Sequence, residues 1–182
     1  MANITLAMTG SISAYKAADL TSQLTKLGHK VTVLMSRSAM DFITPLTLQS
    51  LSKNLVHTEV MVEEDPSLIK HIDIAKETDL FLVAPASANT IAKLAHGMAD
   101  NIVTATALAL PIGIPKLIAP AMNTNMYLNP ATQKNLNTLE EYGFDEVKPR
   151  EALLACGDFG TGALAEVTDI LEKVSNTLNE KK

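Results

Sequence analysis

Two short segments, at 85–90 and 120–127, carry side chains that could bind a flat polar ligand. Each follows an apolar run, opens with Pro-Ala, and then offers hydroxyl or amide groups such as Ser87 and Asn123. Small residues allow a ring to approach the backbone, and the polar groups supply hydrogen bonds. Two such segments at neighbouring strand ends predict a binding cleft, although Asn-rich turns also form for purely local reasons.

The segment 9–14 and the serines after the next apolar run could bind a phosphate. Backbone N–H groups at a helix start, with a glycine and the Ser11 hydroxyl, can form an anion site. The segment lacks both the glycine spacing of dinucleotide loops and the lysine of a Walker loop. Ser36 and Ser38 stand where an NAD site would place an acid, so the pattern favours a phosphate-bearing mononucleotide. Helix capping by Ser11, Ser13, Ser36 or Ser38 is the alternative interpretation.

Cys156 is the only cysteine in the chain and precedes three glycines within six residues. A thiol in such a flexible segment could donate a proton or act as a nucleophile once the segment closes as a lid. On this segment alone, a buried cysteine beside a turn is the favoured alternative. A single cysteine excludes an internal disulfide and a cysteine-based zinc site.

His71 is expected on a helix that precedes the third strand. A lone histidine in such a place is more often solvated or packed than catalytic, so the residue alone does not indicate a reaction. No pair of histidines has metal-ligand spacing with a carboxylate, and no metal site is expected.

These segments would be positioned by strands and helices that alternate along the chain. Apolar runs predict strands at 4–8, 30–34, 80–84 and 116–119, with a weaker strand near 146–148. Helices are predicted at 13–27, 87–95, 130–142 and 166–178. The alternation predicts one α/β domain over 1–182, with a doubly wound parallel sheet and ligands beyond the carboxyl ends of its strands.

Composition narrows the class of protein. A chain of 182 residues corresponds to about one domain, and its net charge of −5 argues against a nucleic-acid partner. Charged residues make up only 19% and apolar residues 47%, so an oligomer that hides surface is expected. No apolar run reaches about 18 residues and no signal peptide is visible, so we expect a cytoplasmic protein without a membrane partner.

Four segments resemble, in order, the flavin-dependent cysteine decarboxylases. Residues 120–127 are similar to that family's Pro-x-Met-Asn-x-x-Met-Trp signature, with Tyr127 in place of the tryptophan. Segment 85–90 resembles its second FMN loop, and 71–75 resembles its active-site histidine segment. Segment 155–162, Ala-Cys-Gly-Asp-x-Gly-x-Gly, resembles the substrate clamp of the branch that decarboxylates 4′-phosphopantothenoylcysteine in coenzyme A biosynthesis. Leu164 stands where many relatives have methionine.

The resemblance implies a Rossmann-like fold, a homotrimer or a dodecamer of four trimers, and FMN at a subunit interface. It implies a lid at 153–164 and three catalytic residues: His71, Asn123 and Cys156. The residues that match the family's FMN site are Gly10, Ser11, Ile12, Ser36, Ser38, Phe42, Ser87, Ala88, Asn89, Thr90 and Ala121. Those that match its substrate site are Asn123, Met126, Ala155 and Gly157.

The implied reaction converts 4′-phosphopantothenoylcysteine to 4′-phosphopantetheine through a thioaldehyde and an ene-thiolate. FMN would take and return a hydride, because direct loss of CO2 would leave an unstabilised carbanion. His71 would act as a base or position the carboxylate, Asn123 would orient the substrate, and Cys156 would supply the last proton.

Three other interpretations stay open within the same fold. A peptidyl-cysteine oxidative decarboxylase would stop at the ene-thiol, and a flavin prenyltransferase would use the flavin differently; the clamp segment argues against both. A non-catalytic phosphatase-regulatory relative would carry a long acidic extension, and none is seen. Because the chain ends soon after the clamp, the resemblance favours the stand-alone form of the decarboxylase.

Overall fold

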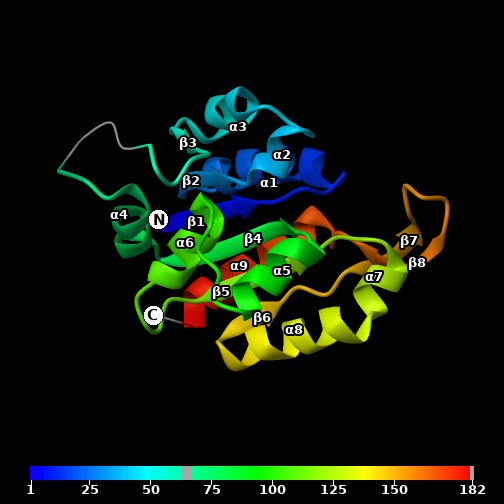
Figure 1. Ribbon diagram of the computed structural model, residues 1–182. Helices are drawn as coiled ribbons and strands as arrows, with labels where there is room; N and C mark the ends of the chain where they lie inside the picture. The colour runs from blue at the N-terminus through cyan, green and yellow to red at the C-terminus, as the bar shows by residue number, and fades with distance from the viewer. Residues whose placement is uncertain (63–66, 181–182) are drawn as a thin grey trace.

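A six-stranded parallel sheet forms the centre of the protein, with strand order β3-β2-β1-β4-β5-β6. The computed structural model describes residues 1–62 and 67–180, and Figure 1 shows their arrangement. The strands are β1 (Asn3–Met8), β2 (Lys30–Met35), β3 (Val56–His57), β4 (Leu80–Ala86), β5 (Lys116–Pro120) and β6 (Phe144–Glu146). The strand order reverses between β1 and β4, which creates the crevice where doubly wound sheets bind ligands. The predicted fold class is confirmed.

The sheet is covered by helices on both faces (Figure 1). They are α1 (Ala14–Lys26), α2 (Arg37–Met40), α3 (Pro45–Ser52), α4 (Lys70–Glu77), α5 (Ala88–Ala95), α6 (Ile102–Ala109), α7 (Thr124–Leu128), α8 (Pro130–Glu141) and α9 (Val167–Glu180). Side chains of α1, α3 and α9 contribute to one core cluster, and those of α5, α6 and α8 to the other.

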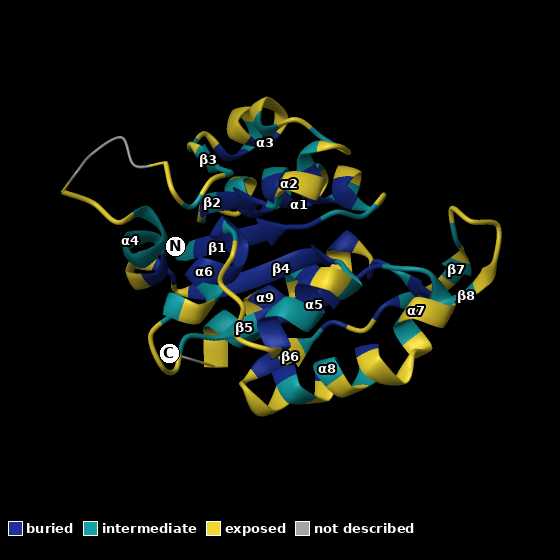
Figure 2. Cartoon of the chain, viewed as in Figure 1, coloured by how far each residue is buried: buried dark blue, intermediate teal, exposed yellow. Residues whose placement is uncertain are grey.

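Alternate residues of the central strand β4 supply the two cores. Leu82 packs in the cluster beneath α1 and α9, while its neighbours Phe81 and Val83 pack in the cluster beneath α5 and α8. Successive side chains of a strand point to opposite faces, so a strand covered on both faces must be apolar throughout. All seven residues of β4 are buried, as the dark blue sheet in Figure 2 shows.

A two-stranded antiparallel hairpin stands apart from the sheet. Its strands are β7 (Arg150–Leu153) and β8 (Phe159–Ala163), and it lies beyond the carboxyl ends of the main strands, beside α7 (Figure 1). The hairpin contains most of the segment 153–164, so the glycines expected in a lid lie in a regular turn and strand.

The weak strand predicted at 146–148 lies two residues earlier. Phe144 is the buried residue of β6 and pairs with Lys116, whereas Val147 follows the strand and donates its N–H to Ile118. The predicted bounds were wrong because Val147 is also buried and apolar. A short alternating pattern therefore does not show whether the strand is centred near Phe144 or near Val147.

Candidate active site

The loops after β1 and β4 are held together at the point where the strand order reverses. The buried Thr9 hydroxyl donates to Pro85 O at 2.8 Å and accepts from Ser87 N at 2.8 Å. This pair of hydrogen bonds brings the start of α5 beside the start of α1. The segments 9–14 and 85–90, each singled out from the sequence, therefore lie next to each other.

A cavity of about 480 Å³ opens beside these loops, between them and the β7–β8 hairpin. Its size suits a cofactor or a drug-sized ligand. Eleven of the predicted site residues line it: Gly10, Ser11, Ile12, Phe42, Ser87, Ala88, Ala121, Asn123, Met126, Ala155 and Cys156. Segments far apart in the sequence thus converge on one site, as expected from two loops at neighbouring strand ends.

The first loop, at 9–14, has the features of a phosphate-binding site. A Cβ added to Gly10 would lie 2.5 Å from Ser38 Cβ, so only glycine allows the two loops to approach this closely. The Ser36 hydroxyl is buried and has no hydrogen-bond partner among the described residues. Neither Ser13 nor Ser36 caps its helix with its side chain, which removes the capping interpretation for these two.

The polar side chains of the second loop, at 85–90, occupy different environments. Ser87 lines the cavity but also accepts a hydrogen bond from Thr90 N at 3.3 Å, as a helix cap does. Thr90 is buried beneath this cap, and Asn89 is exposed on the first turn of α5. The structure therefore puts Ser87 on the cavity wall and leaves Thr90 behind it.

Three polar side chains meet where the hairpin reaches the start of α7. Asn123 Nδ2 donates to Cys156 Sγ and to Asp158 Oδ2, both at 3.3 Å. The Cys156 thiol donates to the same carboxylate oxygen at 3.3 Å. Cys156 is exposed, so the buried-cysteine interpretation of this segment was wrong. An amide, a thiol and a carboxylate in mutual contact at a cavity can bind a polar substrate and move a proton.

The orientation of the Asn123 amide is set by its place in the chain. Asn123 begins α7, and its Oδ1 accepts from Asn125 N at 2.8 Å, which directs Nδ2 towards the hairpin. The hairpin is in turn docked on the segment before α7, because Met122 N donates to Gly162 O at 2.9 Å. Gly162 is buried at this contact, and a Cβ there would lie 2.2 Å from Met122 O.

Four charged residues of the site were not among those predicted from the sequence: Lys16, Arg150, Asp158 and Glu166. Lys16 and Arg150 line the cavity, and Glu166 pairs with Lys16 Nζ at 3.3 Å and with Arg150 Nε at 2.9 Å. Lys16 lies three residues after Ser13 on α1, so helical spacing could have placed it beside the first loop. Asp158 lies two residues after Cys156, but nothing in the local pattern indicates that it contacts Asn123. No sequence signal indicates Arg150.

His71 lies elsewhere in the chain. It is on α4, at the end of the molecule opposite the hairpin, and it does not line the cavity (Figure 1). Its Nδ1 is buried without a hydrogen-bond partner among the described residues. Gly157 lies at the tip of the hairpin next to Cys156, outside the cavity lining.

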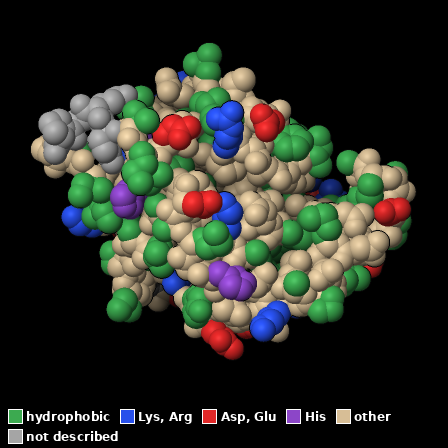
Figure 3. Space-filling view, in the orientation of Figure 1, with side chains coloured by type: hydrophobic (Ala, Val, Ile, Leu, Met, Phe, Trp, Pro, Cys, Tyr) green, Lys and Arg blue, Asp and Glu red, His purple; other side chains and the backbone are tan. Residues whose placement is uncertain are grey.

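Three features of the described residues concern the surface, metal-ligating side chains and the length of the apolar helices. Green hydrophobic side chains are spread over the face in Figure 3, and Ile112, Leu153 and Phe159 are all more than two-thirds exposed. Within residues 1–62 and 67–180, no cluster of three metal-ligating side chains occurs. In the same residues, no helix is both long and apolar enough to cross a membrane.

The chain resembles known proteins over nearly its whole length. The profile of a protein family described as Flavoprotein matches residues 1–179. The chain is 60% identical over 175 residues to a probable phosphopantothenoylcysteine decarboxylase of Streptococcus mutans, covering 96% of this chain and 98% of that protein. It is 46% identical to the coenzyme A biosynthesis bifunctional protein CoaBC of Bacillus subtilis, covering 93% of this chain but only 41% of the relative.

Solved structures show the same likeness. A phosphopantothenoylcysteine (PPC) decarboxylase mutant complexed with pantothenoylaminoethenethiol superposes with a TM-score of 0.88 and 32% identity, over 98% of each chain. The FMN-dependent cysteine decarboxylase SpaF superposes with a TM-score of 0.86 and 27% identity, over 99% of this chain and 97% of that one.

Proposed function

Because this chain belongs to the Flavoprotein family, we propose that its cavity decarboxylates 4′-phosphopantothenoylcysteine to 4′-phosphopantetheine, a step of coenzyme A biosynthesis. The observation that carries the proposal is the contact of Asn123 with Cys156 and Asp158 at the cavity. This contact unites the two sequence segments that resemble the decarboxylase signature and its substrate clamp. The reaction replaces the substrate carboxylate with a proton and releases CO2.

FMN is the cofactor that the first loop fits. A phosphate needs unpaired donors at a helix start, and the buried Ser36 hydroxyl beside the Gly10–Ser38 contact supplies one. Small residues at Ala88 and Ala121 leave the cavity wall open to a flat ring. When bound, FMN supplies reversible hydride transfer at the carbon that bears the substrate thiol.

Asn123 and its neighbours orient the substrate and deliver the proton. The Asn123 amide orients the substrate by hydrogen bonds, and Met126 packs beside it at the cavity wall. The Cys156 thiol delivers the proton that the product carbon needs after CO2 has left. The neighbouring Asp158 carboxylate accepts the thiol hydrogen bond and thereby holds the thiol towards the cavity.

Lys16 and Arg150 suit the phosphate of the substrate. Both are cations at the cavity, and both are paired with Glu166 in the free chain. A phosphate carries more negative charge than a carboxylate and offers three acceptor oxygens, so it can compete for the two cations. A peptidyl-cysteine substrate has no such group.

His71 would complete the site from a second copy of the chain. Its α4 and the cavity are at opposite ends of one chain, so His71 cannot reach a substrate in its own cavity. The exposed Leu153 and Phe159 on the hairpin offer apolar surface that another subunit can cover. A homo-oligomer such as a trimer would place FMN at that interface, with His71 acting on the carboxylate.

The mass of the product tests the proposal. The purified protein is loaded with FMN, given 4′-phosphopantothenoylcysteine, and analysed by mass spectrometry. Loss of CO2 alone is expected. Loss of both CO2 and two hydrogens would instead identify an oxidative, peptide-type decarboxylase. Unchanged substrate with bound flavin would refute the assignment and leave a regulatory or prenyltransferase role.

Two variants separate the proposed steps. Cys156→Ser should still release CO2 but accumulate the ene-thiol, because the last proton is missing. His71→Asn should block CO2 release while flavin binding is retained. Normal turnover by Cys156→Ser would refute the proton-donor role, and loss of flavin from His71→Asn would show a structural role.

A further inference from the structure

The short helix α7 carries two cavity residues but buries no side chain of its own. Asn123 begins the helix and Met126 lies within it, yet none of the five helical side chains is buried. A helix of this length is not stable by itself. The position of Asn123 therefore depends on contacts with neighbouring elements: the hairpin holds the segment before α7 through Met122, and Tyr127 holds the end of the helix.

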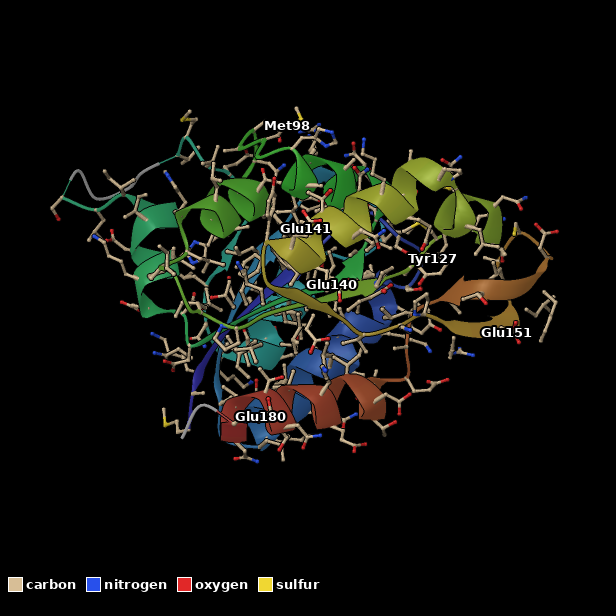
Figure 4. All side chains as sticks on the ribbon, turned by 90° about the horizontal axis from the view of Figure 1, so that it is seen from below. Met98, Tyr127, Glu140, Glu141, Glu151 and Glu180 are labelled. Atoms are coloured by element: carbon tan, nitrogen blue, oxygen red, sulfur yellow. The ribbon has the colours of Figure 1, made fainter. Side chains whose placement is uncertain are left out.

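Tyr127 makes the contacts at the end of the helix. Its hydroxyl donates to Glu146 Oε1 at 3.0 Å, and its ring packs against the core cluster beneath α5 and α8. Its backbone closes the turn, because Tyr127 N donates to Asn123 O at 3.0 Å, and Gln133 Nε2 donates to Tyr127 O at 2.6 Å. Figure 4 labels Tyr127 near the point where α7 passes into α8.

Glu146 is a fixed partner for this hydroxyl. It is the last residue of the edge strand β6 and pairs with Ile118 of β5. Its side chain is half-buried, with Lys148 and Glu140 as the other charged groups nearby. A carboxylate at a strand end is thus linked to the helix turn that begins with Asn123.

The protonation states set the direction of this hydrogen bond. Burial, with the adjacent Glu146 carboxylate, raises the pKa of Tyr127 to about 12, so the phenol keeps its proton at neutral pH. Burial also raises the pKa of Glu146. The phenol therefore donates and Glu146 accepts, and at 3.0 Å the contact has the length of an ordinary hydrogen bond.

We propose that Glu146, acting through the Tyr127 hydroxyl, is a positioning residue that holds Asn123 and Met126 against the substrate. The link runs from β6 to the Tyr127 hydroxyl, through one backbone turn to Asn123, and from the Asn123 amide to Cys156. Glu146 and Tyr127 line a separate hollow, and Glu146 does not line the substrate cavity. The inference rests on the proposed decarboxylase function.

Five variants isolate the link: two that break it, one conservative rescue and two controls. Tyr127→Phe removes the donor and keeps the ring, and Glu146→Leu removes the acceptor. Glu146→Gln keeps an oxygen that can accept and serves as the conservative rescue. Tyr142→Phe is the matched control on a tyrosine that is about half exposed, and Glu140→Gln is the matched control for loss of a neighbouring negative charge.

Decarboxylation kinetics of the FMN-loaded protein give the first measurement. Tyr127→Phe and Glu146→Leu should lower kcat by about tenfold to a hundredfold, since displacements of about 1 Å have costs of this order. KM should change less, and FMN affinity should be unchanged. Glu146→Gln, Tyr142→Phe and Glu140→Gln should stay near the wild-type rate. Wild-type kcat in Tyr127→Phe would overturn the proposal.

Hydrogen exchange of the amides at 123–128 gives a second measurement that needs no substrate. Exchange should be faster in Tyr127→Phe and Glu146→Leu, and unchanged in the two control variants. Faster exchange with an unchanged kcat would overturn the positioning role. Absence of CO2 release by the wild-type protein would refute the proposed function, and unchanged exchange in Tyr127→Phe would then refute the link independently.

Discussion

Gly162→Ala should displace the hairpin from α7 and separate Cys156 from Asn123. The added Cβ would lie 2.2 Å from Met122 O, and real contacts of this kind are not found below 3.0 Å, so the two must separate by at least 0.8 Å. The obstacle is a backbone oxygen, which cannot rotate away. The same movement breaks the hydrogen bond from Met122 N to Gly162 O.

The energetic consequence can be estimated from these two effects. Forcing extra volume into a packed contact costs about 1–3 kcal/mol. Loss of the hydrogen bond adds about 0.5–1.5 kcal/mol. Docking of the hairpin is therefore weakened by about 2–4 kcal/mol, and a shift of about 1 Å at the site should lower decarboxylation by about a hundredfold.

The assay compares this variant with a second glycine whose obstacle can be removed. A Cβ at Gly160 would lie 2.6 Å from Thr124 Oγ1 and 3.0 Å from Thr124 Cγ2, which are side-chain atoms. Gly160→Ala should also lose activity, and Thr124→Ala should restore it in the double variant. No side-chain substitution should restore Gly162→Ala.

Steady-state decarboxylation, FMN binding and thermal unfolding are measured for each protein. Flavin binding and the unfolding transition should be retained in Gly162→Ala, which separates a displaced hairpin from an unfolded protein. Wild-type turnover by Gly162→Ala would refute the reasoning, because the backbone would then have relaxed without cost to the site. Failure of Thr124→Ala to restore Gly160→Ala would refute the steric explanation at the second position.

Three further predictions concern stability. Leu82 is fully buried in the centre of β4, so Leu82→Ala should lower the free energy of unfolding by about 2–5 kcal/mol and the melting temperature by roughly 10 °C. A decrease in melting temperature of less than about 2 °C would contradict this prediction. Asn101→Ala removes the side-chain acceptor for Val103 N and Thr104 N at the start of α6, and should cost about 1 kcal/mol in urea unfolding. Burial raises the pKa of Glu146 above its usual 4.5, so its protonated form favours the fold and this stability is lost as the pH rises through the raised pKa. Glu146→Gln should therefore gain melting temperature relative to the wild type as the pH rises from 4 to 8, and a constant difference would contradict the cause.

The sheet could be predicted from the sequence because its central strands are continuous apolar runs. β4 is buried on both faces and therefore has no polar alternation that could be confused with a surface strand. α6 could not be found in this way, because Ile102–Ala109 is apolar or threonine throughout and shows no helical period. β3 has only two residues, too few for any pattern.

The site was predictable in part for a similar reason. Ser87 directly follows β4 and Asn123 lies three residues after β5. Strand ends of a parallel sheet meet at one edge, so their proximity follows from the fold. The contact of Asn123 with Asp158 joins residues 35 positions apart through docking of a hairpin on α7. That docking depends on close glycine contacts in three dimensions, and no local spacing encodes it.

The distance between His71 and the cavity has a consequence for mixtures of variants. If each site takes Cys156 from one chain and His71 from its neighbour, a chain with His71→Asn and a chain with Cys156→Ser carry complementary defects. Each homogeneous protein is impaired, yet a mixed assembly contains some sites with both native residues. Co-expression of the two variants should therefore restore part of the overall reaction, and dilution that dissociates the assembly should abolish it. Each active site would then lie between two chains, and each chain would contribute residues to two different sites.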